Sequence, residues 1–137
     1  MQTLSQRTVN FIKENNPFFI FLLVNPDYYG HLDGENSERY EQEFIRSDYW
    51  LGVILQLIDR SNTKWIVISD HGFDENKTTH RNAPDAWMAT DLPIKSIYCS
   101  GETVGTIRDV ANTILDFYGI DSKTRLPKMR GKSLLRH

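Results

Sequence analysis

The stretch "WIVISDHGF", from Trp65 to Phe73, decides the fold. Apolar residues suited to a buried strand run directly into Asp70, His71 and Gly72. In open α/β sheets, ligand sites form beyond the carboxyl ends of the strands. We therefore expect residues 64–69 to form a strand of such a sheet, with Asp70 and His71 placed where the sheet carries its chemistry.

The segments before this stretch alternate between helix and strand patterns. Apolar residues at roughly helical spacing predict a helix over residues 4–16, which ends before Pro17. The continuous apolar run over residues 18–24 predicts a strand covered on both faces. The turn-forming residues of 25–36 predict a loop.

A long helix is expected next, with Asn36 or Ser37 as its N-cap. Its predicted apolar stripe consists of Tyr40, Phe44, Leu51, Leu55 and Ile58.

Beyond the opening stretch, residues 70–85 predict a second long polar loop, and residues 86–90 and 94–99 predict two short strands. A final helix is expected to begin after Thr106 as N-cap, with Asp109 at its third position, and to stop at Gly119.

This order of elements predicts an α/β fold, with an open, mainly parallel sheet flanked by helices. The length of 137 residues is enough for one domain with its own core, so we expect a single α/β domain over residues 1–137.

Composition excludes several classes of function. The net charge is −2 and no basic run stands out, so a nucleic acid duplex is not an expected partner. Cys99 is the single cysteine, so no internal disulfide can form. No segment has the length of a membrane span or the pattern of a signal peptide. At face value this predicts a cytoplasmic chain, although a longer protein containing it could be extracytoplasmic.

Metal-ligand residues gather in the two predicted loops. The first loop holds Asp27 and His31, and the second holds Asp70, His71 and His80, so three of the four histidines lie there. Carboxylates and imidazoles are the ligands of zinc, with manganese as the harder alternative. If the two strands are neighbours, these residues could anchor two cations. Each pair alone has an ordinary explanation as a solvated turn. We likewise expect the nearby Asp74 to be a solvated loop acid, with a partner that orients His31 or His71 as the alternative.

Longer motifs resemble a known superfamily. "PDYYGHLDG", then "SERYEQEFIRSDYWLGVIL", then "WIVISDHGF" resemble the alkaline phosphatase superfamily, closest to its type I phosphodiesterase/nucleotide pyrophosphatase branch. "VGTIRDVANTILDFYGI" and "PKMRGKSLL" are similar to the closing helix and final motif of that superfamily. The resemblance covers nearly the whole chain.

The resemblance implies two divalent metal ions, with zinc expected and manganese as the alternative. It assigns Asp27, His31 and His80 to the first ion, and Asp70 and His71 to the second. His80 is followed by Arg81, where these enzymes commonly have glycine.

The nucleophile of the family and another aspartate ligand belong to the N-terminal half, and nothing before Asp27 matches them. The chain is therefore expected to be the C-terminal portion of an alkaline-phosphatase-like catalytic domain, with an incomplete sheet that could favour self-association.

The implied function is metal-dependent hydrolysis of phosphoric esters, at a phosphodiester or a nucleotide pyrophosphate bond of a small-molecule substrate. One alternative is a sulfatase, or a phosphotransferase or mutase, of the same superfamily. Another is an inactive, truncated metal-binding or structural domain, since the isolated chain lacks a matching nucleophile.

Overall fold

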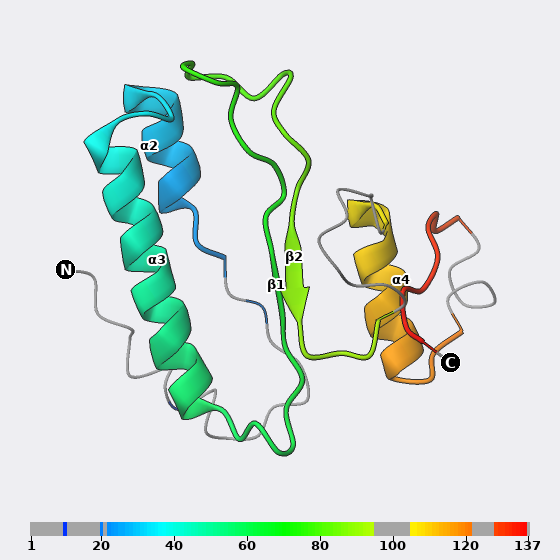
Figure 1. Cartoon of the computed structure of the whole chain (residues 1–137). Helices are drawn as coiled ribbons and strands as arrows, with labels where there is room; N and C mark the ends of the chain where they lie inside the picture. Colours follow the sequence, from blue (N-terminus) through cyan, green and yellow to red (C-terminus); the bar gives the residue numbers. More distant parts are fainter. Residues whose placement is uncertain (1–9, 11–19, 21, 95–104, 122–127, 137) are drawn as a thin grey trace. The chain divides into compact units, whose positions relative to one another are not determined.

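The computed structural model describes residue 10, residue 20 and the ranges 22–94, 105–121 and 128–136. It divides into two compact units. The first consists of Met1–Lys64 and His71–Asp85, and the second of Trp65–Asp70 and Ala86–His137. Helices and strands are both present, in agreement with an α/β fold (Figure 1). The prediction of one domain over residues 1–137 stays a prediction.

Two helices, α2 (Asn25–Asp33) and α3 (Glu38–Leu57), lie side by side in the first unit (Figure 1). Gly34 ends α2 with a positive φ of 91°, a conformation that glycine adopts without strain. Ser37 then caps α3, where its side-chain oxygen accepts a hydrogen bond from the Tyr40 N–H at 3.2 Å. This confirms the predicted start of the long helix.

The prediction of a loop over residues 25–36 is wrong, because most of this segment is α2. Its start and stop signals are present in the sequence. Pro26 lies in the first turn, where its fixed φ suits a helix and its missing N–H is not needed. Asp27 also lies in the first turn and complements the helix dipole, while Gly34 supplies the stop.

The buried strand predicted over residues 18–24 is not found in the part of it that the structure describes. Ile20 and residues 22–24 are exposed, with Leu22 reaching 79%, and none of them belongs to a strand. An apolar strand needs neighbours to pair with and to cover its faces, and the described residues provide neither here. The other positions of this run lie outside the described residues.

Apolar packing along α3 agrees only partly with the predicted stripe. Ile54 is buried and four stripe positions are half-buried, but Phe44 is 46% exposed. Neither Ile54 nor the other buried residue of α3, Glu43, belongs to the predicted stripe. The Glu43 carboxylate accepts hydrogen bonds from Asn25 at 3.0 Å and Arg46 at 2.5 Å. Glu43 thereby ties the start of α2 to α3.

The second unit contains the strands β1 (Ile66–Ile68) and β2 (Met88–Thr90). They confirm the strands predicted over 64–69 and 86–90, and they pair antiparallel, with Ile66 opposite Thr90. The connection between them holds no helix, whereas a parallel pair needs a crossover that is usually helical. The open, mainly parallel sheet is not observed among the described residues and stays a prediction.

Helix α4 (Ile107–Phe117) completes the second unit and confirms the predicted boundaries. Thr106 and Asp109 form its capping box, and Gly119 follows its end with a φ of 67°. Leu92, Ile94, Leu134 and Leu135 form the apolar core. Of the strand predicted over 94–99, only Ile94 is described, and it forms a bridge with Leu135. Cys99 lies outside the described residues. The helix predicted over 4–16 also lies outside them, apart from Asn10.

None of the described helices has the length and apolar character that a membrane crossing requires.

Candidate metal centre

Helix α2 brings the first pair of predicted ligands together. Asp27 and His31 are separated by four positions, which places them on one face of a helix, a single turn apart. The Asp27 Oδ1 atom lies 3.4 Å from His31 Nε2, and both side chains are about half exposed. The pair is therefore accessible to an ion from solvent.

The loop over residues 71–85 supplies two more imidazoles in the same unit. The rings of His71 and His80 are stacked, with centroids 4.1 Å apart. His71 Nε2 lies 3.7 Å from Asp27 Oδ1, and the His80 ring is 5.0 Å from that of His31. One carboxylate oxygen therefore faces imidazole nitrogens from both α2 and the loop.

Backbone carbonyls orient the rings of His31 and His71. His31 Nδ1 lies 2.8 Å from the Thr78 carbonyl oxygen, and His71 Nδ1 lies 3.1 Å from that of Gly72. A carbonyl only accepts hydrogen bonds, so these contacts assign the proton to Nδ1 in both rings. Nε2 is then the nitrogen that each ring turns toward Asp27.

The ligand atoms of Asp27, His71 and His80 all lie within 4.8 Å of one another. One carboxylate and two imidazoles match the chemistry of catalytic zinc sites, and they also suit manganese. The residues therefore fit a divalent cation.

The grouping differs from the assignment implied by the resemblance, because His71 joins Asp27 and His80 while His31 stands beside them. Asp70 is exposed at the end of β1, in the second unit. The assignment of all five residues to two ions stays a prediction.

Asp74 organises the loop that carries His80. Its carboxylate accepts hydrogen bonds from Thr79 Oγ1 and from the Asn82 N–H, both at 2.7 Å. Its own N–H donates to the Thr79 carbonyl at 2.8 Å. Asp74 is only 5% exposed, so the expectation of a solvated loop acid is wrong.

These contacts predict acid sensitivity of the loop. The hydrogen bond from Thr79 lowers the pKa of Asp74 below its usual value, with the Asn82 N–H adding to the effect, and burial acts in the opposite direction. A lowered pKa in the folded state means that the stabilisation is complete above the unfolded pKa of about 3.9 and is lost as the pH falls through the folded value. We expect amide exchange at Asn82, measured by NMR, to accelerate in that acid range. Asp74→Asn should abolish this pH dependence.

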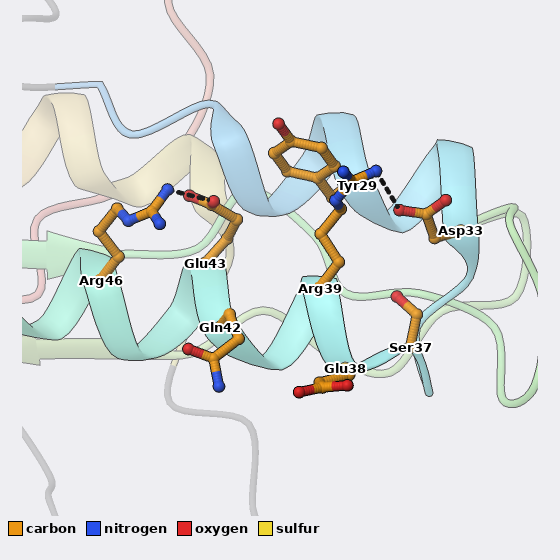
Figure 2. A pocket seen from close by; sticks show the side chains of 8 residues that line it. All are labelled: Tyr29, Asp33, Ser37, Glu38, Arg39, Gln42, Glu43 and Arg46. Carbon is orange, nitrogen blue, oxygen red and sulfur yellow. Dashed lines mark hydrogen bonds and ion pairs between the residues drawn. The ribbon is translucent and has the colours of Figure 1, made fainter. Parts of the chain in front are cut away.

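A second feature of the unit is an open hollow of about 580 Å³ lined by α2 and α3 (Figure 2). Both of its arginines are paired, Arg39 with Asp33 at 3.4 Å and Arg46 with Glu43 at 2.5 Å. Arg39 also lies over the ring of Tyr29, 5.0 Å from its centroid. Since acids neutralise both guanidinium groups, the hollow offers no strong anion site.

Comparison with known proteins gives a consistent set of relatives. A family model described as type I phosphodiesterase / nucleotide pyrophosphatase matches residues 2–115. Similar curated proteins are named 2,3-bisphosphoglycerate-independent phosphoglycerate mutase. That of Metamycoplasma hominis is 34% identical over 128 residues, which cover 90% of this chain and 24% of that protein. The mutase of Paracoccus denitrificans is 27% identical over 137 residues, which cover 96% of this chain and 26% of that protein.

The mutase of Halobacterium salinarum is 30% identical over 118 residues, covering 82% of this chain and 22% of that protein. The chain thus spans about a quarter of the length of the relatives it matches. No solved structure matches significantly.

Proposed function

Because this chain belongs to the type I phosphodiesterase / nucleotide pyrophosphatase family of the alkaline phosphatase superfamily, we propose that it forms the metal-binding portion of a phosphotransferase of the mutase type. The similarity to phosphoglycerate mutases over 90% or more of the chain carries this proposal. The substrate class that follows is a small phosphorylated acid, whose phosphoryl group moves between two positions.

The proposed ligands are Asp27, His31 and His80 for one divalent ion, and Asp70 and His71 for another. The close approach of Asp27, His71 and His80 supports a metal centre here. Zinc is the ion we propose, with manganese as the alternative. We also propose that residues 1–137 are the C-terminal portion of an α/β catalytic domain whose sheet is mainly parallel.

This chain's own residues would contribute binding and orientation. Asp27 brings negative charge to the site, and the Thr78 and Gly72 carbonyls hold His31 and His71 with Nε2 directed toward Asp27. A divalent cation bound there would supply Lewis acidity toward a phosphoryl oxygen. The nucleophile that receives the phosphoryl group is proposed to come from sequence that corresponds to the N-terminal half of the family.

The decisive experiment uses the native-length protein that contains this chain, stripped of metal and then reloaded with Zn²⁺ or Mn²⁺. We expect metal-dependent interconversion of 3-phosphoglycerate and 2-phosphoglycerate without added 2,3-bisphosphoglycerate. The control is the metal-free protein with Mg²⁺ alone. Absence of this interconversion under every metal condition would reject the mutase proposal.

Hydrolysis of phosphoric esters is the second candidate, and the description of the matching family favours it. Bis(p-nitrophenyl) phosphate tests it in parallel on the same metal-loaded samples. Turnover of the diester together with inertness toward phosphoglycerates would select the hydrolase. Failure of both reactions would favour the inactive, structural alternative.

A further inference from the structure

We propose that Phe73 is a positioning residue that sets the spacing of the histidines in the candidate metal centre. The inference rests on the proposed function, because it concerns the same centre. Phe73 is 8% exposed and lies two positions after His71. Its hydrocarbon ring cannot bind a metal or exchange protons, so any role in the centre must operate through packing.

The Phe73 ring contacts all three imidazoles that gather around Asp27. The centroid distances are 5.1 Å to His31, 5.8 Å to His80 and 6.1 Å to His71. The interplanar angles lie between 72° and 86°, so each pair meets edge to face. This is a favoured geometry for aromatic pairs, worth about 0.5–1.5 kcal/mol beyond burial. One rigid ring therefore restrains the planes of three potential ligands.

Helices α2 and α3 hold the Phe73 ring from two further sides. A Cβ atom added at Gly30 would lie 2.5 Å from Cζ and 2.6 Å from Cε2 of Phe73, so the ring occupies the space of a side chain at that position. Tyr40 of α3 meets the ring at a centroid distance of 5.6 Å. The glycine beside His31 is therefore explained by packing, since any larger residue would displace the ring.

This arrangement couples α2 to the loop that carries His71 and His80. Asp27 and His31 come from the helix, whereas the other two imidazoles come from a polar loop whose side chains are mostly exposed. A buried aromatic ring between the two segments fixes their separation. Hydrogen bonds to carbonyls alone do not fix it. Removal of the ring should leave the ligands present but free to turn away from Asp27.

The test compares metal binding by the wild-type chain and Phe73→Leu, with Ile54→Ala as a matched core variant. Ile54 is equally buried but lies fourteen positions beyond Tyr40, about 21 Å along the helix axis at 1.5 Å per residue. We expect Phe73→Leu to weaken Zn²⁺ binding by about 10–100-fold, as loss of a supporting residue does. The visible spectrum of bound Co²⁺ should change as well. Ile54→Ala should lower stability and leave the Co²⁺ spectrum unchanged.

A second variant probes the same contact from α2. Gly30→Ala should also weaken Zn²⁺ binding, because the new methyl group displaces the ring. The double variant should lose no more affinity than Phe73→Leu alone, since both changes act through one contact and should not add. Additive losses, or a Phe73→Leu protein with wild-type affinity and spectrum, would overturn the proposal.

Failure of the metal centre itself would be seen separately. If the wild-type chain binds neither Zn²⁺ nor Co²⁺, the proposed centre is wrong, and Phe73 is then judged from the metal-free protein. Nuclear Overhauser effects between the Phe73 ring and the imidazoles of His31, His71 and His80 are expected there, and they should vanish in Gly30→Ala. Absence of these effects in the wild-type protein would reject the positioning role directly.

Discussion

Asp27→Asn will weaken Zn²⁺ binding by more than about 100-fold. An oxygen of the Asp27 carboxylate faces imidazole nitrogens from two segments, His31 at 3.4 Å and His71 at 3.7 Å. An amide of the same shape keeps the packing but removes the negative charge. Loss of a residue that only supports a ligand costs about 10–100-fold in affinity, so loss of a ligand should exceed that range. Isothermal titration of the metal-free chain measures the effect.

The matched control is Asp33→Asn, which makes the same chemical change on the same helix. Asp33 pairs with Arg39 at 3.4 Å on the hollow shown in Figure 2, and it is not a member of the ligand group. The affinity of the Asp33→Asn protein for Zn²⁺ should stay within about twofold of wild type, because an exposed ion pair contributes little to stability. Equal affinities for all three proteins would show that the ion, if bound, is held elsewhere.

The sequence indicated residues that gather in the candidate metal centre but not how they are held. Asp27, His31, His71 and His80 could be selected because carboxylates and imidazoles concentrate in two segments. The helix that positions the first pair was missed, since "NPDYYGHLDGEN" is dense in residues that also form turns. The four-residue spacing of Asp27 and His31, together with Pro26 and Gly34, was the signal that could have revealed α2.

The role of Phe73 could not be read from residue types. A phenylalanine after "DHG" is compatible with any buried strand end, and only the three-dimensional contacts show that it touches three imidazoles. The same holds for Asp74, whose partners Thr79 and Asn82 lie five and eight positions away. The conformation of a polar loop depends on such specific hydrogen bonds, which composition does not encode.

Local signals predicted α3 and α4 but missed α2, and they predicted the strands without their pairing. Ser37 and Thr106 begin α3 and α4 because capping acts within one turn of chain. Strand pairing depends on residues far apart, so the pattern predicted β1 and β2 without their antiparallel register. The apolar run before Asn25 shows the same limit, because its coverage depends on partners outside the segment.

Asp109→Ala will destabilise the α4 region by about 3 kcal/mol. Asp109 is 3% exposed, and its carboxylate accepts hydrogen bonds from the Thr106 N–H at 2.8 Å and the Lys132 N–H at 2.7 Å. Truncation removes the helix cap, which is worth about 0.5–2 kcal/mol. It also leaves backbone N–H donors without their acceptor, and each donor that stays buried costs about 1–3 kcal/mol. Hydrogen exchange at the amides of Lys132 and Leu134 measures the local loss.

The same carboxylate should make this loss depend on pH. Burial acts to raise the pKa of Asp109, but the hydrogen bonds from Lys132 and Thr106 outweigh it and lower the pKa below its usual value. The stabilisation is therefore complete above the unfolded pKa of about 3.9 and disappears as the pH falls through the folded value. The difference in stability between wild type and Asp109→Ala should be constant near neutral pH and should shrink in that acid range.

The control is Asp85→Ala, at an exposed loop position. It should change stability by less than about 0.5 kcal/mol at any pH. If the stability difference between wild type and Asp109→Ala stays the same in acid, Asp109 acts through packing rather than through its charge.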